Sequence, residues 1–287
     1  CWQGYRRAMG DVLLFTDADT IHHPELLGRA VAELGRSGAG ALSLVGVQLM
    51  ESFWERLIQP QIFMAMLFRF PDMGRSLPPE RWRDAVANGQ YLLFRRDTYE
   101  ALGGHERVKG AVVEDLRFAQ ILVEEGYGLA MRRAEKHLAT RMYRSLAELV
   151  AGWSKNIIRG GIQTLPPALR PWMPITSMAA TAALWLAPAL VLFGTAGVHA
   201  WGAVAGGEPW AVAAATSTGA LLTWSGAVVA ASALFWMAVS YRFGAPARYG
   251  PLYPLGALMT VYIMGRAWHR MGRVEWKGRR YAVGMPE

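Results

Sequence analysis

Cysteine is nearly absent from this chain of 287 residues, which has one, at position 1. A single cysteine excludes an internal disulfide, so the chain is not a small secreted domain held together by disulfides. Hydrophobic residues make up 53% of the chain and charged residues 18%. This composition excludes an intrinsically disordered chain, because such chains bury too little apolar surface to fold.

Charge is missing from a long part of the sequence. Two uncharged runs, residues 171–207 and 209–241, are 37 and 33 residues long and are separated by Glu208. A membrane-spanning helix needs about 20 apolar residues. Each run is therefore long enough for one span, and we predict spans over residues 176–198 and 217–239. A buried helical hairpin of a soluble protein is the alternative.

A third uncharged stretch, residues 249–265, is short for a span, and we expect a short tilted crossing or a re-entrant segment. Basic residues set the orientation of such chains, because loops rich in Lys and Arg stay in the cytoplasm. The loop at Glu208 has neither, whereas Arg242 and Arg248 follow the second run. We therefore predict a multi-pass protein of the cell (inner) membrane, with the Glu208 loop outside and the domain before residue 172 in the cytoplasm.

Most of the formal net charge of +8 comes from the end of the chain, where residues 242–287 contain eight Lys or Arg and two Asp or Glu. Residues 1–172 are nearly balanced, with 22 basic and 19 acidic side chains. A uniformly basic surface for nucleic acid does not fit this distribution, so we expect a membrane and no nucleic-acid partner.

The first part of the chain shows alternating strand and helix patterns. Apolar runs predict strands at Val12–Phe15, Ala41–Val47 and Tyr91–Phe94, the first buried on both faces. This alternation predicts an α/β fold with helices on the faces of a sheet. Helical patterns predict helices from Pro24 to Gly35, over residues 51–70 and over Glu114–Glu125. Two capping boxes, Asp97–Glu100 and Ser145–Glu148, each predict the start of a further helix, the second running towards Arg159. The helix over 51–70 is unusually apolar, and either packs in the core or faces lipid or a lipid-like substrate.

Two carboxylates directly follow the first predicted strand. Asp17 and Asp19 are two residues apart and point the same way. Ligands of α/β sheets bind beyond the carboxyl ends of strands, and Mg²⁺ prefers a few carboxylates together with phosphate oxygens. This position favours a metal and diphosphate site over the plainer interpretation, a pair of solvated turn aspartates.

A second chemistry shares this pattern. The run from Phe15 to Thr20 also fits the D-x-D-x-T start of aspartyl-phosphate hydrolases, with Asp17 as the nucleophile and Asp19 as a general acid. That mechanism needs a lysine, for which Lys109 is available, and a further acidic pair after a strand, which we do not find. An aspartyl-phosphate phosphohydrolase is therefore the alternative enzyme, and a membrane scaffold without catalysis is the non-enzymatic alternative.

Another acidic pair, Glu114 and Asp115, begins a predicted helix. The positive end of the helix dipole favours the ionised form of a carboxylate in the first turn. Beside a metal and diphosphate site, such a carboxylate can take the proton of a hydroxyl nucleophile. Acidic residues in a first turn also simply stabilise helices, but together with Asp17 and Asp19 they indicate a catalytic base.

Four motifs, in this order, resemble family 2 glycosyltransferases. They are Asp-Ala-Asp at 17–19, Asn-Gly-Gln at 88–90 before Arg95-Arg96, Gly-Gly-His at 103–105 and Glu-Asp at 114–115. The resemblance covers about residues 1–172. The apolar region that follows resembles the membrane-bound members that glycosylate lipids, such as ceramide glucosyltransferase and the carotenoid- and hopanoid-associated branches.

The resemblance implies a partial GT-A fold, a nucleotide-sugar donor, a lipid or isoprenoid acceptor, and Mg²⁺ or Mn²⁺. Asp19 matches the metal-binding aspartate, and Asp17 matches the residue nearer the ribose and sugar, beside the metal. Asp115 matches the general base of an inverting transfer, with Glu114 beside it. Other residues expected to contact substrate are Asn88, Gly89, Gln90, His105, Trp153 and Lys155.

The sequence departs from the family pattern in two places. The Q-x-x-R-W motif of polymer-forming members is replaced by Gly152-Trp153-Ser154-Lys155-Asn156, so we expect a single, non-processive transfer. Trp153 and Lys155 then face the site or belong to an amphipathic helix at the membrane surface. The uridine-binding half of the family precedes the D-x-D motif and is not in this sequence, so we expect an N-terminally truncated catalytic domain, whose activity belongs to the longer protein.

These inferences divide the chain into four parts. We expect the C-terminal portion of a GT-A catalytic domain over residues 1–145, an amphipathic interfacial helix and linker over 146–172, a transmembrane region over 173–267, and a basic tail over 268–287.

Overall fold

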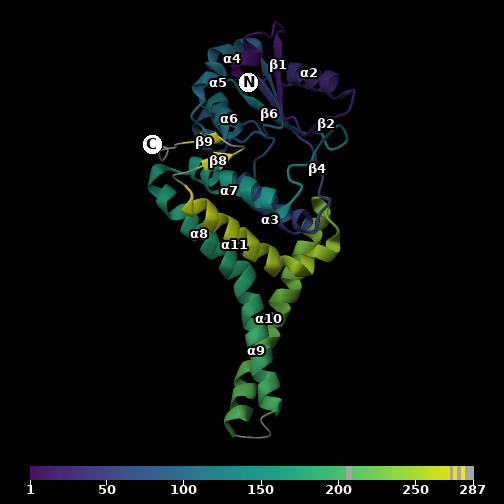
Figure 1. Cartoon of the computed structure of the whole chain (residues 1–287), viewed down its shortest axis with the longest axis vertical. Helices are drawn as coiled ribbons and strands as arrows, with labels where there is room; N and C mark the ends of the chain where they lie inside the picture. The colour runs from purple at the N-terminus through teal and green to yellow at the C-terminus, as the bar shows by residue number, and fades with distance from the viewer. Residues whose placement is uncertain (205–208, 272–273, 277–278, 282–287) are drawn as a thin grey trace.

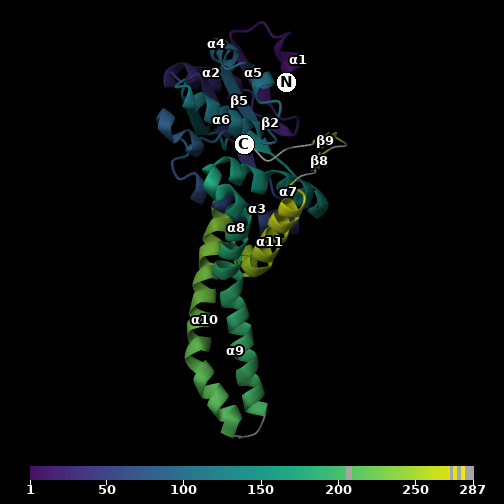
Figure 2. The same ribbon diagram turned by 90° about the vertical axis from the view of Figure 1, so that its left-hand side faces the viewer.

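The computed structural model describes residues 1–204, 209–271, 274–276 and 279–281. An α/β domain rests on a layer of helices, and two long helical segments extend from that layer as a stalk (Figure 1). A view turned by 90° shows the same stalk beneath the same domain (Figure 2). The predicted fold class, an α/β domain followed by apolar helices, is confirmed.

Among the described residues the strands form three sheets. The main sheet has the order β1-β5-β3-β6, a smaller sheet has the order β2-β7-β4, and β8 pairs with β9. The strands are β1 (Val12–Thr16), β2 (Thr20–His22), β3 (Ala41–Val45), β4 (Val47–Gln48), β5 (Tyr91–Arg95), β6 (Leu129–Arg133), β7 (Leu138–Thr140), β8 (Val274–Trp276) and β9 (Arg279–Tyr281).

The direction of β5 decides which motifs meet. β5 runs antiparallel to both of its neighbours, β1 and β3, whereas β3 and β6 are parallel. The carboxyl end of β1 therefore lies beside the start of β5, where Thr16 pairs with Tyr91. The backbone N–H of Asp17 donates to the carbonyl of Gln90 at 3.4 Å. This register brings the D-x-D motif next to residues 88–90.

Strand β1 is the edge of the main sheet, and Leu13 is its buried residue. The prediction that this strand is buried on both faces is wrong. As an edge strand, β1 pairs with β5 alone, and its other four residues keep contact with solvent. The second predicted strand also differs, since β3 ends at Val45. A Cβ on Gly46 would lie 2.4 Å from the carbonyl oxygen of Leu138, so the chain passes too close to β7 here for any other residue.

The α/β domain contains α1 (Trp2–Tyr5), α2 (Leu26–Ser37), η1 (Pro79–Asp84), α4 (Arg96–Ala101), α5 (Gly104–Arg107) and α6 (Glu114–Glu124). Alternate residues of β5 supply two cores, because side chains of a strand point to opposite faces. Leu93 packs with α2 on one face, and Phe94 packs with Phe118 of α6 on the other. The main sheet is thus covered on both faces, as an α/β fold requires.

Two predicted helix ends differ from the structure. Helix α2 continues past Gly35 to Ser37, because Gly38 is the residue with the left-handed φ of 66° that ends it. The predicted capping box at Asp97 is wrong, since α4 follows β5 directly from Arg96 and the Asp97 carboxylate accepts from the adjacent Thr98 N–H at 2.6 Å. At Ser145 half of the predicted box forms, because Glu148 accepts from Arg144 N–H instead.

The helical layer and the stalk follow. They contain α3 (Phe53–Arg69), α7 (Leu146–Gln163), η2 (Pro167–Trp172), α8 (Met173–Thr181), the π-helical turn η3 (Ala182–Leu186), α9 (Ala187–Val204), α10 (Pro209–Arg242), η4 (Ala247–Leu252) and α11 (Tyr253–His269). Helices α3, α7 and α11 share a core that includes Ile58, Trp153 and Ile263. The core interpretation of the helix over 51–70 holds for its first half, where Ile58 and Ile62 are buried, whereas Phe68 near its end is exposed.

Among the described residues, two helical segments are long and apolar enough to cross a membrane, Pro167–Gly202 and Thr218–Arg242, by length and composition. Only 11% and 17% of their most apolar windows are buried, unlike the core helix of a soluble protein. The predicted span over 176–198 lies within the first segment, and the span over 217–239 begins one residue before the second. α11, which contains most of the third stretch, lies across the layer of α3 and α7 and does not accompany the stalk (Figure 1). Glu208 and parts of the basic tail lie outside the described residues.

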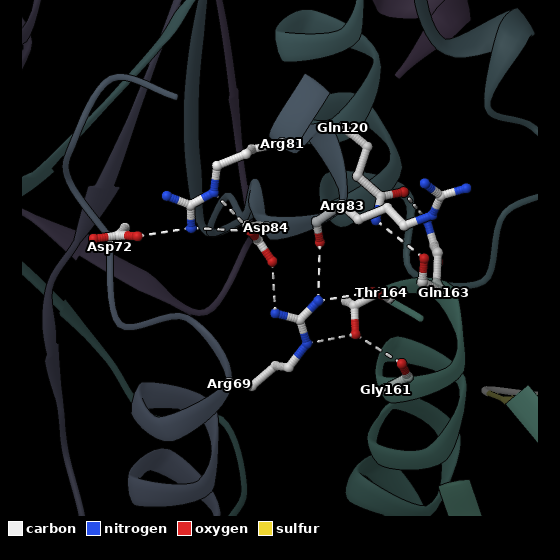
Figure 3. A network of polar contacts seen from close by, with 9 residues as sticks. All are labelled: Arg69, Asp72, Arg81, Arg83, Asp84, Gln120, Gly161, Gln163 and Thr164. Atoms are coloured by element: carbon white, nitrogen blue, oxygen red, sulfur yellow. Dashed lines mark hydrogen bonds and ion pairs between the residues drawn. The ribbon is translucent and has the colours of Figure 1, made fainter. Parts of the chain in front are cut away.

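A polar network joins the α/β domain to the helical layer (Figure 3). Arg69, the last residue of α3, pairs with Asp84 of η1 at 3.0 Å and donates to the side chain and carbonyl of Thr164 at 2.8 and 2.7 Å. Arg81 binds the other oxygen of Asp84 at 3.0 Å. Burial would raise the pKa of Asp84, but the two arginines outweigh it and lower this pKa. The network therefore fixes α7, which carries Lys155, relative to the sheet.

Candidate functional site

The D-x-D motif occupies the turn between β1 and β2. The Thr20 hydroxyl donates to the carbonyl of Asp17 at 2.7 Å, and the Thr16 hydroxyl donates to the carbonyl of Gln90 at 2.8 Å. His22 Nε2 lies within hydrogen-bond distance of both hydroxyls, at 3.1 and 3.0 Å. These contacts hold the backbone of the turn and leave both carboxylates facing solvent.

Several carboxylates gather at this turn. Asp17 keeps solvent contact, yet the surrounding protein desolvates it, and the charges of Asp19, Asp115 and Glu114 add to that effect. Together they raise the pKa of Asp17 to about 6, against the opposing charge of Lys155. The charges of Asp19, of the second acidic pair and of Lys155, which come from separate parts of the chain, therefore all act on Asp17.

The Asn-Gly-Gln motif holds the backbone beside Asp17 and Asp115 in place. The side chain of Asn88 donates to the carbonyl of Leu44 at 2.9 Å. Gln90 is buried, and its Oε1 accepts from Gln48 at 2.8 Å. The side chains of Asn88 and Gln90 are thus engaged within the protein, and they hold the start of β5 where Gly89 faces Asp115.

Asp115 is fixed by two backbone N–H groups. Gly89 N–H donates to its Oδ2 at 2.9 Å, and Leu116 N–H donates to its Oδ1 at 2.8 Å. A Cβ at position 89 would lie 3.0 Å from that Oδ2 and 3.1 Å from the Asp115 Cβ, so any other residue here would push the Asp115 side chain by a few tenths of an ångström. Asp115 therefore has one orientation, set jointly by β5 and α6.

The pKa values of the second acidic pair are raised. Burial raises the pKa of Asp115, while the hydrogen bonds from Gly89 and Leu116 and the charge of Lys155 act against it. Burial and the neighbouring Asp115 raise the pKa of Glu114. Carboxylates with raised pKa values at the end of a sheet are a common property of catalytic sites.

Trp153 and His105 lie differently from the other predicted site residues. Trp153 is buried, with 6% of its surface exposed, and its ring packs against Tyr143 at 6.0 Å between centroids. Burial and then the charge of Asp19 raise the pKa of Tyr143. His105 bonds through Nδ1 to the Tyr99 hydroxyl at 2.7 Å, and burial lowers its pKa to about 4. It is therefore a neutral, partly buried histidine.

Two residues at the site were missed by sequence reasoning, Gln48 and Tyr143. Oε1 of Gln48 is buried and has no partner among the described residues, while its amide binds Gln90. Gln48 lies in a two-residue strand that the apolar pattern merged with the strand before it, so no sequence signal marked it. Tyr143 follows β7, and its proximity to Asp19 depends on tertiary packing alone.

The lysine required by the hydrolase alternative is not the one found here. Lys109 is 77% exposed and pairs with Glu106 at 3.9 Å. The lysine whose charge acts on Asp17, Glu114 and Asp115 is Lys155 of α7. The charge of Lys155 thus acts on Asp17, while Asp115 is a separate carboxylate fixed by two backbone N–H groups.

Comparison with known proteins finds two similarities. Residues 2–103 match the family model described as glycosyl transferase family 2, a match that ends before Glu114 and Asp115. The chain is 23% identical to the 4,4'-diaponeurosporenoate glycosyltransferase of Staphylococcus aureus (strain MRSA252), over 99% of this chain and 70% of the relative.

Proposed function

We propose that this chain, a family 2 glycosyltransferase, moves one sugar from a nucleotide-sugar donor to a membrane lipid or isoprenoid, with inversion at the anomeric carbon. Glycosyl transfer in general follows from the family match and from the relative. The name of that relative gives an apolar carotenoid-type acceptor, which supports a similar class of acceptor for this chain.

One observation carries the proposed mechanism: the Asp115 carboxylate is held by Gly89 and Leu116 N–H groups within the same acidic cluster as Asp17. In an inverting transfer the acceptor oxygen attacks the anomeric carbon from the face opposite the leaving diphosphate, and a base takes its proton. Asp115 is suited to that role because its orientation is fixed. Its raised pKa makes it a stronger base than an ordinary aspartate, and Lys155 favours its ionised form.

The D-x-D turn fits a divalent cation. Asp17 and Asp19 offer carboxylate oxygens. Burial, and then the charge of Asp19, raises the pKa of Asp17, and a bound cation would offset both effects. When bound, Mg²⁺ or Mn²⁺ would neutralise negative charge on the departing diphosphate. Asp19 and Asp17 would hold it, and the backbone bonds of Thr16 and Thr20 would keep the turn in place.

The acceptor is proposed to arrive from the membrane. The stalk helices keep most of their apolar surface exposed, and α3 adds the exposed Leu67 and Phe68 on the same helical layer. Lipid is the environment that such surfaces favour. Lys155 lies on α7 in that layer, and its charge acts on Asp17 and Asp115, which supports a site between the sheet and the helices.

The test is a transfer assay on the complete gene product in lipid nanodiscs, with nucleotide-sugar donors and lipid or isoprenoid alcohols. We expect acceptor-dependent release of the nucleotide and an inverted anomeric configuration in the product, read by NMR. A retained configuration would contradict the assigned base. Phosphate release without sugar transfer would favour the phosphohydrolase instead.

The same assay distinguishes acceptor classes. A hydroxyl must lose its proton, whereas a carboxylate, the form that the name diaponeurosporenoate denotes, is already ionised. Loss of the Asp115 carboxylate should therefore slow transfer to an alcohol much more than transfer to a carboxylate. Equal losses with both would assign Asp115 to substrate positioning.

A further inference from the structure

Two histidines and a glutamate meet on the small sheet, apart from the acidic cluster. His23 directly follows β2, Glu25 is the residue before α2, and His137 directly precedes β7. β2 and β7 are antiparallel, with His22 opposite Leu138. The pairing continues one residue further, since His23 N–H donates to the carbonyl of His137 at 2.8 Å. The two histidines are thus cross-strand neighbours.

Their side chains converge. The imidazole rings are 5.3 Å apart between centroids and nearly perpendicular, at 88°. His137 Nε2 lies 3.9 Å from Glu25 Oε2, and Glu25 N–H donates to His23 Nδ1 at 3.3 Å. One ligand atom from each of the three residues lies within 4.8 Å of the other two. Ligand atoms of a tetrahedral zinc ion are about 3.3 Å apart, so small side-chain rotations complete the site.

We propose that His23, Glu25 and His137 bind a Zn²⁺ ion at a site separate from the D-x-D turn. Two imidazole nitrogens and one carboxylate oxygen are a known zinc ligand set that leaves one position for water. The partial exposure of these residues allows that water. Imidazole suits Zn²⁺, whereas Mg²⁺ and Mn²⁺ prefer oxygen ligands, so the two sites select different ions.

The Arg29 side chain binds Glu25 and would compete with a metal ion for this carboxylate. Its Nε and Nη2 both donate to Oε2 of Glu25, at 2.9 and 2.7 Å. Both bonds use Oε2, the oxygen that lies 3.9 Å from His137 Nε2, so a metal would bind either the other oxygen of Glu25 or Oε2 in place of Arg29. The positive charge of Arg29 nevertheless opposes a second cation nearby. Removing this charge should therefore tighten zinc binding, whereas a merely crowded cluster of side chains would gain nothing.

The position of the site gives the ion a structural effect. β2 begins at Thr20, immediately after Asp19, and zinc at His23 and His137 would hold its far end to β7. An ion that binds the folded protein alone stabilises it. Zinc should therefore raise the Tm and slow hydrogen exchange in the β2–β7 pair.

The experiment is a zinc titration of the complete gene product, purified without a histidine tag, stripped of metal, and competed against a chromophoric chelator. We expect one site per chain. His137→Ala and Glu25→Gln should each weaken binding at least about tenfold, since even partners of metal ligands are worth about 10–100-fold. His269→Ala, at an exposed histidine elsewhere, is the matched control and should change nothing.

Two further comparisons test whether zinc binds at these three residues. Arg29→Gln should tighten binding, and zinc should raise the Tm of this variant as it does for the wild type. Zinc binding by wild type that is no stronger than that of His137→Ala would overturn the proposal. So would binding that is lost in Asp19→Asn and kept in His137→Ala, because the ion would then occupy the D-x-D turn.

Discussion

The hydrogen bond from Gly89 to Asp115 is where single residues decide the geometry of the site. It joins the start of β5 to the start of α6 at 2.9 Å. The acidic residue supplies the chemistry, and the glycine permits the approach. Three predictions test what this pair and its neighbour Asp17 contribute.

Asp115→Asn should keep the shape of the site and lose its base. We expect kcat to fall by about 10²–10⁴-fold, the usual contribution of general base catalysis, with donor affinity nearly unchanged. Turnover and donor binding of the complete enzyme check this. Asp11→Asn makes the same chemical change at an exposed aspartate and should be neutral. Lost donor binding would assign Asp115 to the nucleotide pocket.

Gly89→Ala should displace Asp115 without removing it. The new Cβ would lie 3.0–3.3 Å from the Asp115 side chain, so that side chain must shift by a few tenths of an ångström. We expect kcat to fall by about tenfold, because small misplacements of catalytic groups are costly. Gly35→Ala in α2, where nothing lies within 4 Å, is the control. It should leave kcat unchanged and slightly stabilise the helix.

Cation binding at the D-x-D turn should depend on pH. Asp17 must be ionised to bind a cation, and its pKa is raised from the ordinary 3.8 to about 6. Affinity for Mn²⁺ should therefore fall as the pH drops below about 6, by at most about tenfold per pH unit, because one proton competes. Mn²⁺ titrations between pH 5 and pH 8 measure this. A flat profile for wild type, or the same slope in Asp17→Asn, would contradict the assignment.

At the scale of elements, the Arg69 network holds the helix that carries Lys155 against the α/β domain. Arg69 is 30% exposed, and it contacts Asp84 and Thr164 through charged hydrogen bonds (Figure 3). Arg69→Ala should lower the free energy of unfolding by about 2–3 kcal/mol. Arg75→Ala, which breaks the ion pair between the 80% exposed Arg75 side chain and Asp72, should cost less than about 1 kcal/mol. Thermal unfolding in detergent compares the two; equal effects would leave the network without a role.

At the scale of the whole molecule, α9 and α10 extend away from the α/β domain as a stalk (Figure 1). With the α/β domain in the cytoplasm, cysteine at Glu208 should react with an impermeant maleimide on intact cells, because the sequence predicts that the loop at Glu208 lies outside. Cysteine at Arg248, an exposed residue of η4, should react only after permeabilisation. Cys1→Ser removes the single cysteine of this chain. The opposite labelling pattern would reverse the predicted orientation.

Local patterns determined the elements of this protein. Apolar runs located β1, β3 and β5, and helical periodicity located α6 and α7, because side-chain burial repeats along each element. The same reasoning found both acidic pairs, since each stands at the end of a strand or the start of a helix. The same reasoning was wrong at β1, because this strand lies at the edge of the sheet. It was also wrong at Asp97, because α4 follows β5 directly and leaves no room for a capping residue there.

Only the tertiary structure decided which residues meet. The antiparallel direction of β5 puts Gly89 beside Asp115 and Gln90 beside Asp17, and this depends on pairing between segments far apart in the chain. The sequence marked Trp153 as a site residue, and tertiary packing buries it against Tyr143. His23 and His137 are 114 positions apart and adjacent in space. Hydrophobic periodicity is a property of one element, whereas these contacts come from the order and direction of strands.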